Sequence, residues 1–427
     1  MNKCKLGELL EIKHGYAFKS ENYVEKSQYA LVTLANISGT NNFQFTKEKT
    51  TYYGAKFPEE FILKTGDLIM PLTEQVVGLF GNSAFVPEME NITFVLNQRV
   101  GKVIPKKGKA DIYYLHYLLS TNSVREQLEY RASGTRQRNI SPKDIYDVDV
   151  FVPDYEEQKK IGSTLYKLEQ RVNNNNKINA ELEYMAKTLY DYWFLQFEFP
   201  NEEGKPYKSS GGKMVWNEEL KREIPEGWEV QTVKKCIHHI NTGLNPRDNF
   251  KLGNGHIKYI TVKNLTVNGT IDFSDCDQID EEARKIVHKR SDVSRGDILF
   301  ASIAPLGRCV IVQENPRDWD INESVFCIRP NLNKVSTELL YMFFMSDYFV
   351  KKAEHSSTGS VFNGIRISTL EGMLILIPTK SIKDKFTDTV KNIFAKKYQN
   401  EKENQEIISI RDFLLPLLMN GQVGFKE

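Results

Sequence analysis

Side chains that can bind phosphates and read bases cluster in one stretch of the sequence. Between Tyr130 and Asp144 no acidic residue interrupts a series of cations, amides and hydroxyls, namely Arg131, Thr135, Arg136, Gln137, Arg138, Asn139 and Lys143. Cationic groups bind phosphates, whereas amides and hydroxyls can hydrogen-bond to base edges. The stretch therefore favours a loop that contacts DNA, although a solvated charged surface remains the alternative for each single cation.

Further basic and amide residues lie elsewhere in the chain. After Ala283 only Asp292 opposes a basic run, and a later Gly- and Ser-containing stretch adds three more candidates; together these are Arg284, Lys285, Lys289, Arg290, Ser360, Asn363 and Arg366. Lys19 and Arg99 are further DNA-binding candidates. Turn formation or packing at strand ends explains the segments around these two residues equally well.

Signatures of catalysis are missing from the sequence. It has no Asp/Asn-Pro-Pro-aromatic motif for adenine methylation, no glycine-rich cofactor loop after a strand and no GxxxxGK phosphate loop. His238 and His239 are the only close histidine pair, and adjacent residues of a strand point to opposite faces, which argues against a metal site. Asp154 and Glu156 near Lys159 superficially resemble a nuclease cluster, but capping of a helix start explains the acids better. We therefore expect a chain that is non-catalytic by itself.

Composition places limits on the class of protein. The 427 residues include 57 basic and 56 acidic side chains, so the chain is not a uniformly cationic nucleic-acid binder. Forty per cent of the residues are hydrophobic, which is enough to form cores. The five cysteines form no CxxC pair, and the longest apolar runs are far shorter than the roughly 20 residues that span a bilayer. These features predict a soluble, cytoplasmic protein with two or three domains.

The sequence contains two copies of one module. Matching segments are Pro153 with Pro378 and Asn175 with Asn400 at a shift of 225 (378 − 153), and Gly66–Ile69 with Gly296–Leu299 at a shift of 230 (296 − 66). Several matches along one register indicate a duplication. The repeat also places the stretch His355–Arg366 where the first copy has its basic loop.

Each copy combines a mixed head with a long helix. Short β-branched runs broken by turns precede a helical stretch in each head, at 112–131 and 336–353, and the long helices would start at Asp154 and Ser381. The predicted fold class is α+β, with two similar mixed α/β domains joined by two long helices that form an antiparallel coiled coil. The predicted segments are heads at 1–153 and 228–378, helices at 154–197 and 379–420, a linker at 198–227 and a tail at 421–427.

The two long helices are predicted to pair with each other. A helix with one apolar stripe must bury that stripe, and a repeated chain can do so by antiparallel pairing. Placing Asn175 opposite Asn400 brings apolar residues together at both ends, and the pairing set is then Ile161, Leu168, Asn175, Leu182, Leu189, Trp193, Ile382, Phe386, Ile393, Asn400, Ile407 and Leu414. An asparagine in such a seam fixes register at a cost in stability. The alternative is that the run Asn173–Asn176 interrupts the first helix as a loop.

Several motifs connect the chain with a known family. They are Ile224–Val230 (IPEGWEV), Tyr192–Phe194 with Phe199–Pro200, Thr358–Arg366 (TGSVFNGIR), Leu414–Val423 (LLPLLMNGQV) and Glu157–Ile161 (EQKKI) after Pro153. With these motifs and the repeat, the chain resembles the DNA-specificity subunit of type I restriction–modification systems over essentially its whole length. It departs from the family pattern at Asp384-Lys385, where Glu-Gln would be expected.

The resemblance implies a DNA-reading role within a larger complex. Each head would be a target recognition domain for one half of a bipartite, asymmetric site, and the helices would set the spacing between the halves. Two modification subunits would bring S-adenosylmethionine and adenine-N6 methylation, while this chain binds no cofactor or metal; restriction (motor–nuclease) subunits would join where a restriction enzyme is formed.

Two other functions remain open from the sequence. One is a two-headed scaffold that binds carbohydrate or protein, and its binding need not weaken steeply with salt as polyanion binding does. The other is an enzyme with an unrecognised site in the heads, which predicts turnover by the isolated chain.

Overall fold

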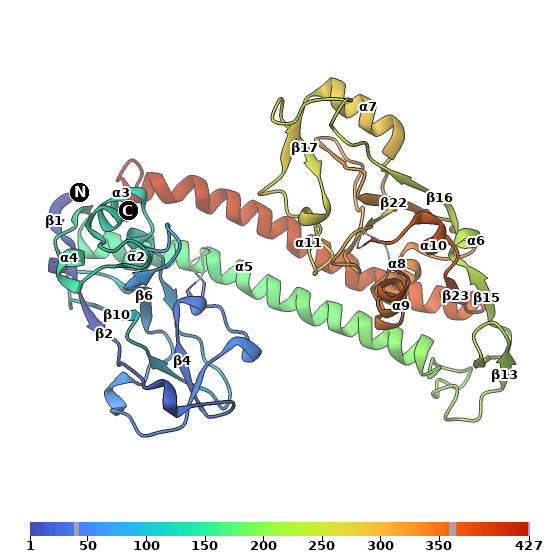
Figure 1. Ribbon diagram of the computed structural model, residues 1–427, viewed down its shortest axis with the longest axis horizontal. Helices are drawn as coiled ribbons and strands as arrows, with labels where there is room; N and C mark the ends of the chain where they lie inside the picture. The colour runs from blue at the N-terminus through green and yellow to red at the C-terminus, as the bar shows by residue number, and fades with distance from the viewer. Residues whose placement is uncertain (38–41, 358–363, 426–427) are drawn as a thin grey trace. The chain divides into compact units, whose positions relative to one another are not determined.

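The computed structural model describes residues 1–37, 42–357 and 364–425, with the side chains of residues 356 and 357 left out (Figure 1). The chain forms two compact units. Unit 1 consists of Met1–Asn174 and Glu403–Glu427, and unit 2 consists of Asn175–Lys402. In the described part of the chain, no helix has the length and apolar character needed to cross a membrane.

Unit 1 is built on a four-stranded antiparallel sheet. In spatial order its strands are β2 (Leu10–His14), β10 (Val100–Pro105), β6 (Leu68–Pro71) and β8 (Ala84–Phe85). A second sheet contains β3 (Tyr23–Val24), β5 (Tyr52–Tyr53), β4 (Tyr29–Val32) and β9 (Thr93–Leu96), with β4 and β9 parallel. Two strand pairs complete the unit: β1 (Asn2–Lys5) with β12 (Asp149–Val152), and β7 (Thr73–Glu74) with β11 (Arg138–Asn139).

The helices of unit 1 are α1 (Leu6–Leu9), α2 (Ile112–Leu119), α3 (Asn122–Arg131), α4 (Pro142–Tyr146) and parts of the two long helices α5 (Tyr155–Tyr190) and α11 (Lys380–Met419). The stretch 112–131 was predicted as one helical stretch, but it is two helices. Ser120 Oγ donates to the Tyr117 carbonyl and Thr121 Oγ1 to the Leu118 carbonyl, both at 2.8 Å. These hydroxyls satisfy the last carbonyls of α2, so the helix can end there.

Unit 2 has a similar set of elements. Its main antiparallel sheet runs β16 (Ile237–Thr242), β22 (Val325–Pro330), β19 (Ile298–Ala301) and β20 (Cys309–Ile311). A second sheet holds β18 (Asp277–Ile279), β17 (Ile257–Ile260) and β21 (Trp319–Ile321), with β17 and β21 parallel. β15 (Glu229–Thr232) pairs with β23 (Leu374–Ile377). The helices are α6 (Val233–Cys236), α7 (Glu281–Ser291), α8 (Thr337–Met345), α9 (Asp347–Ser357) and α10 (Ile367–Glu371).

Two parts of unit 2 differ from the prediction. Within the polar segment 198–227, which was predicted as a linker, Met214–Asn217 (β13) and Arg222–Pro225 (β14) form a hairpin. The helical stretch 336–353 is split at Ser346, whose Oγ donates to the Phe343 carbonyl at 2.7 Å and accepts from the Phe349 amide at 3.2 Å. This serine ends α8, as Ser120 and Thr121 end α2 in unit 1, and it also caps the start of α9.

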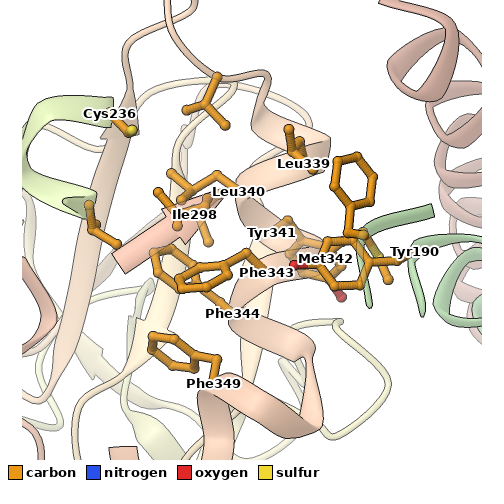
Figure 2. Packing of buried hydrophobic residues seen from close by; sticks show 14 of the residues in the cluster. Tyr190, Cys236, Ile298, Leu339, Leu340, Tyr341, Met342, Phe343, Phe344 and Phe349 are labelled. Carbon is orange, nitrogen blue, oxygen red and sulfur yellow. The ribbon is translucent and has the colours of Figure 1, made fainter. Parts of the chain in front are cut away.

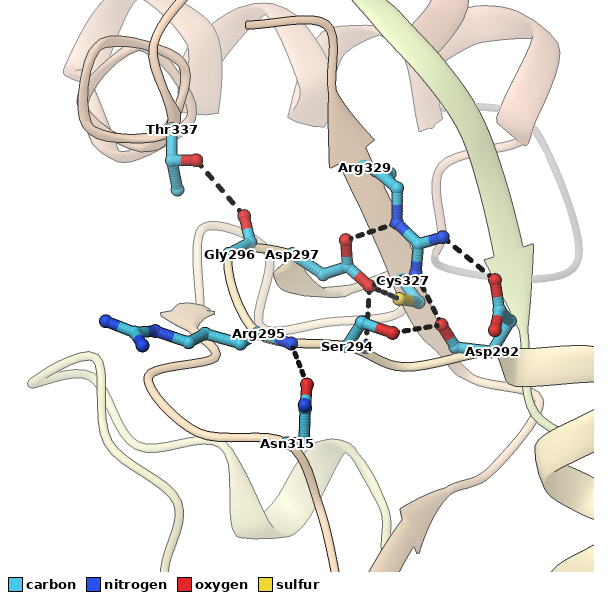
Figure 3. Close-up of polar contacts among 9 residues, drawn as sticks. All are labelled: Asp292, Ser294, Arg295, Gly296, Asp297, Asn315, Cys327, Arg329 and Thr337. Atoms are coloured by element: carbon cyan, nitrogen blue, oxygen red, sulfur yellow. Dashed lines mark hydrogen bonds and ion pairs between the residues drawn. The ribbon is translucent and has the colours of Figure 1, made fainter.

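The same polar contact recurs in both main sheets. In unit 1 the Asp67 carboxylate pairs with Lys102 Nζ at 2.7 Å, and in unit 2 the Asp297 carboxylate pairs with Arg329 Nε at 2.8 Å (Figure 3). Each aspartate also accepts a backbone amide three residues upstream at 2.8 Å. The repeat inferred from the GDLI and GDIL motifs is therefore confirmed at the level of individual contacts.

The units diverge at one connection between the sheets. In unit 2 the 11-residue helix α7 lies between β18 and β19. In unit 1 the connection between β5 and β6 carries the short 3-10 turn Glu59–Phe61 instead. The shared sheet is thus a common frame on which each copy carries a different element.

The long helices run antiparallel within unit 2. Asn400 Nδ2 donates to Asn179 Oδ1 at 2.8 Å, and both side chains are buried. Lys397, three residues before Asn400 on α11, pairs with Glu183, four residues after Asn179 on α5. The antiparallel direction is as predicted, but Asn400 was predicted to face Asn175, and the hydrogen bond is made four residues away. The prediction aligned repeat-equivalent residues with each other, and a shift of about one helical turn keeps the same faces in contact.

The ends of the helices in unit 2 join the core of the head. The ring centroids of Trp193 and Phe386 lie 5.6 Å apart, and those of Phe194 and Phe386 lie 4.8 Å apart. Figure 2 shows Tyr190 of α5 with the apolar side chains of α8, all members of one buried cluster. The head and its helix segments therefore share a single hydrophobic core.

In unit 1 the helices also run antiparallel. Ile161 and Leu165 of α5 share a buried cluster with Leu418 and Met419 of α11, and Arg171 pairs with Glu403 farther along. The twelve predicted pairing residues are buried or half-buried: Ile161, Leu168, Asn175, Leu182, Leu189, Trp193, Ile382, Phe386, Ile393, Asn400, Ile407 and Leu414.

The ends of the long helices agree in part with those predicted from the sequence. Asp154 Oδ1 accepts the Glu157 amide at 3.0 Å, so the predicted cap of α5 is present. α11 begins at Lys380, so Ser381, the predicted cap, is already a helical residue. Gly421 has φ +67°, the left-handed conformation that ends helices after their last turn. α5 is continuous through Asn173–Asn176, so the alternative of a loop at this run is wrong.

Candidate nucleic-acid interface

The basic loop of unit 1 is held at both of its ends. Backbone hydrogen bonds join Ser133 and Asn139 at 3.0 and 2.8 Å, and Thr73 Oγ1 donates to Asn139 Oδ1 at 2.9 Å. The strand pair β7–β11 sets Glu74 opposite Arg138. The residues between these anchors form an exposed loop whose base cannot move independently of β7.

Arg138 belongs to the base of the loop. Its Nη1 lies 2.7 Å from Oε1 of Glu74, a side chain that is only 1% exposed, and its guanidinium lies 5.8 Å from the Phe80 ring centroid. The same carboxylate accepts the Leu79 amide at 2.9 Å and the Phe80 amide at 3.3 Å. Arg138 was predicted to bind DNA, and the structure gives it an internal partner that ties two loops together. Arg131 is also engaged, donating to the carbonyls of Gln127 and Asp147.

The outermost cations of this region are Arg136 and Lys143. Both are exposed, as is Thr135, and Arg136 has no hydrogen-bond or ion-pair partner within the part of the chain that the structure describes. Gln137 Nε2 donates to Asn139 Oδ1 at 3.3 Å, so the two amides lie next to each other. The loop thus offers one unpaired guanidinium beside an amide pair, which suits phosphate and base-edge contacts.

The segments near Lys19 and Arg99, the other two candidates of unit 1, are hydrogen-bonded to each other. The Tyr16 amide donates to the Leu96 carbonyl and the Gln98 amide to the Tyr16 carbonyl, both at 2.9 Å. A Cβ on Gly15 would lie 2.0 Å from the Asn97 carbonyl oxygen, so only glycine fits there. Packing therefore accounts for much of this segment, as the alternative interpretation held.

Leu72 connects these segments with the basic loop. Its amide donates to the Arg99 carbonyl at 2.9 Å, and its carbonyl accepts the Ile140 amide at 3.0 Å. Arg99 is exposed, and Lys19, also exposed, lies 3.8 Å from Glu21. The candidate cations Arg99 and Arg136 are therefore carried by adjoining segments of unit 1.

Unit 2 repeats the anchoring of the loop. The Ile365 amide donates to the Ser302 carbonyl at 2.8 Å, as Ile140 does to Leu72 in unit 1. Arg366 follows as an exposed residue immediately before α10. Ser360 and Asn363, the other two predicted contacts of this loop, lie outside the described residues.

The basic candidates of α7 divide into two groups. Arg284 Nη2 donates to the Pro316 carbonyl at 2.8 Å, and Lys285 pairs with Glu282 at 2.7 Å, so these two are engaged within unit 2. Lys289 and Arg290 are exposed near the end of the helix. These two remain the candidates of α7 for contact with an anion.

A buried carboxylate fixes α7 on its sheet. Asp320 of β21 lies 2.9 Å from His288 Nδ1 and accepts Ser291 Oγ at 2.6 Å. Burial raises the pKa of Asp320, although its hydrogen bonds and His288 act in the opposite direction. The helix is therefore a rigid addition to the frame, and its outer face is fixed relative to the sheet of unit 2.

Sequence reasoning missed one exposed feature of unit 1. Val76 and Val77 are 79% and 68% exposed in the loop that follows β7. Paired valines normally indicate a buried strand, and only the nearby glycine pointed to a turn. Among the described residues, no group of three His, Cys, Asp or Glu side chains is arranged to hold a metal ion.

Comparison with known families places the chain. A family model described as the type I restriction modification DNA specificity domain matches residues 1–184 and again residues 225–409. The chain therefore belongs to the family of type I restriction–modification DNA specificity subunits.

Individual relatives agree with this assignment. The MjaIX specificity subunit of Methanocaldococcus jannaschii is 28% identical over 333 residues, which cover 78% of this chain and 73% of the relative. The EcoBI specificity subunit of Escherichia coli is 24% identical over 413 residues, which cover 94% and 81%. The crystal structure of the S subunit from M. genitalium superimposes with a TM-score of 0.60 over 98% of this chain and 95% of that one; at 16% identity this likeness shows the fold alone.

Proposed function

We propose that the chain is the non-catalytic, DNA-reading subunit of a type I restriction–modification complex, with one head for each half of an asymmetric bipartite site. The observation that carries this proposal is the repeated sheet frame with different elements attached. The common sheet frame would let both heads bind partner subunits in the same manner. The helix α7 in unit 2 and the short turn Glu59–Phe61 in unit 1 would give the two heads different reading surfaces. Different surfaces on one frame suit two unlike half-sites.

The exposed cations supply the contacts with DNA. Arg136 and Lys143 of unit 1, and Lys289 and Arg290 of unit 2, are exposed and would bind phosphates, and neighbouring amides such as Gln137 would reach base edges. With a net charge of only +1, the chain relies on such local groups and on partner subunits to complete a basic channel.

The long helices set the distance between half-sites in this proposal. α5 has 36 residues, which corresponds to about 54 Å of helix. We expect roughly one turn of DNA or less between the half-sites. The buried Asn179–Asn400 contact supports a fixed register, which a spacer of constant length requires.

Two modification subunits dock on the helices and bring the chemistry. The exposed faces carry apolar side chains, with Tyr184 and Met185 on α5 in unit 2 and Ile410 and Phe413 on α11 in unit 1. Met185 and Ile410 are related by the repeat shift (410 − 185 = 225), which supports equivalent sites for two copies of one partner. Those subunits hold S-adenosylmethionine and methylate adenine N6, and restriction subunits add to the same core.

Mapping methylated adenines tests the proposal. The full chain, copurified with two modification subunits of a type I system, should methylate genomic DNA at one bipartite motif whose halves differ and whose gap is constant. Binding should also weaken steeply with salt. Methylation without a gapped motif, or binding that is indifferent to salt, would refute the DNA-reading role and favour a scaffold for other ligands.

A further inference from the structure

The two exposed valines of unit 1 lie in a loop that has a rigid base. Val76 and Val77 are 79% and 68% exposed. Just before them, the buried Glu74 carboxylate accepts the amides of Leu79 and Phe80, which closes the loop from β7 to its far end. The valines are therefore the tip of a closed turn and are not part of a segment that can fold into the core.

A second anchor holds the far side of the turn. Arg125 of α3 donates through Nη1 to the Gly78 carbonyl at 3.4 Å and through Nε to the Ser120 carbonyl at 2.9 Å, and its Nη2 reaches Asn82. Burial lowers the pKa of Arg125, so this guanidinium is a packed structural group. With anchors on both sides, the turn presents the two valines in a fixed position, which limits the entropy lost when they bind.

The surroundings of the turn are those of the candidate nucleic-acid interface. β7 pairs with β11 at the base of the loop that carries Arg136, and Leu72, just before β7, is hydrogen-bonded to the Arg99 carbonyl. Apolar tips flanked by exposed cations suit a ligand whose charged backbone borders apolar groups. Duplex DNA has this arrangement, because the thymine C5-methyl is an apolar group within the major groove.

The corresponding connection of the other head also exposes apolar residues, beginning at the position equivalent to Thr73. Between β19 and β20, Ile303 is 41% exposed and the following Ala304 and Pro305 are exposed as well. Ile303 bridges to Gly364 as Thr73 pairs with Asn139 in unit 1. An exposed apolar turn on both copies of the frame indicates a use common to both heads, although the residues themselves differ.

We propose that Val76 and Val77 are specificity-determining residues that contact thymine methyl groups in the major groove of the half-site read by unit 1. This inference rests on the proposed DNA-reading function and adds a means of reading that the basic and amide side chains do not supply. The cations hold the phosphates and so fix the register, while the valines distinguish thymine from cytosine at the contacted positions.

Replacing thymine with deoxyuridine removes only the C5-methyl and so tests the contact directly. The wild-type complex of the full chain with its modification subunits is measured on a duplex carrying the mapped target, with each thymine of either half-site changed in turn. At one or two positions of a single half-site the affinity should fall about fourfold for each methyl group lost.

The matching protein variant carries Val76→Ser and Val77→Ser. It should bind the unmodified target more weakly by a similar factor for each contact, and it should no longer distinguish thymine from deoxyuridine at those positions. The slope of affinity against salt should stay as in the wild type, because no phosphate contact is removed. Val267→Ser, at a 67% exposed valine of unit 2, is the matched control and should behave as the wild type.

The outcomes separate the two proposals. A wild-type complex that methylates its bipartite motif but is indifferent to every thymine-to-deoxyuridine change overturns the valine contact and leaves the DNA-reading function standing. The valine contact also fails if the double variant keeps the wild-type response to deoxyuridine. A wild-type complex that methylates no motif overturns the function and the valine contact together.

Discussion

Arg136 and Arg138 are two residues apart, and the structure predicts opposite consequences for their loss. Arg138→Ala leaves the buried Glu74 carboxylate without its ion-pair partner, whereas Arg136→Ala removes an exposed guanidinium. Arg138→Ala should therefore destabilise unit 1, and Arg136→Ala should weaken DNA binding while leaving stability unchanged.

The expected cost at Arg138 follows from burial. Breaking a buried ion pair by removing one partner typically costs 3–5 kcal/mol. Glu74 keeps two backbone amide donors, so we expect the lower end, about 3 kcal/mol, which corresponds to a roughly 150-fold change in an opening equilibrium.

The measurement must distinguish the two units. All four tryptophans lie in unit 2, namely Trp193, Trp216, Trp228 and Trp319, so tryptophan fluorescence follows unit 2 and serves as an internal control. Hydrogen exchange of the peptides that contain Glu74 and Arg138 follows unit 1. In Arg138→Ala these peptides should exchange roughly a hundredfold faster, with the fluorescence transition unchanged.

Arg136→Ala is the matched comparison. It should leave hydrogen exchange as in the wild type and should reduce the salt dependence of DNA binding by about one phosphate contact. The reasoning is refuted if Arg138→Ala exchanges at the wild-type rate, or if both variants lose DNA affinity equally with no change in exchange.

Three further predictions concern the helices. Burial raises the pKa of Glu401 from 4.5 to about 7, so this group contributes on the order of 3 kcal/mol to the unfolding free energy below pH 4.5, and this contribution is lost as pH rises to 7. Glu401→Gln should therefore make the unfolding free energy, measured by urea titration with tryptophan fluorescence, less dependent on pH in this range. An unchanged pH dependence would contradict this assignment. Asn179→Leu with Asn400→Leu should raise the urea midpoint of unit 2 and relax the register seen in cross-linking, whereas a single register with unchanged stability would exclude this role. Inserting about four residues into both helices, or ~6 Å, should change the accepted gap in the DNA motif by roughly one to two base pairs, as mapped by methylation. An unaltered gap would exclude a spacer role for the helices.

Local and periodic features of the fold were predictable from the sequence. The duplication, the long helices and the start of α5 at Asp154 all follow from spacing and capping chemistry. The register was less accessible, because a shift of one turn brings the same faces of two helices together, and Asn179 and Asn175 both lie on the buried side. The breaks at Ser120 and Ser346 were missed because a serine in a helix interior and a serine at a helix end look alike in sequence.

The site depended on contacts that the sequence does not reveal. The exposed cation Arg136 and the half-buried Arg138 share one basic loop, and only the pairing of β11 with β7, 64 residues earlier, separates a surface group from a structural one. Val76 and Val77 carry no polar group that would mark them as a site, and β-branched residues favour strands over exposed turns. Composition indicated the region of the candidate interface, and long-range pairing determines which of its cations has an internal partner.

Unit 1 is started first and completed last during synthesis. Leu418 and Met419 join the same core as Ile161, and the Phe425 amide donates to Glu157 Oε1 at 3.2 Å. The whole of unit 2 is therefore synthesised before the last residues of this core. A nascent chain that stops early leaves the apolar face of α5 uncovered, where chaperones and proteases act, so a finished first head is itself a sign that translation has passed α11.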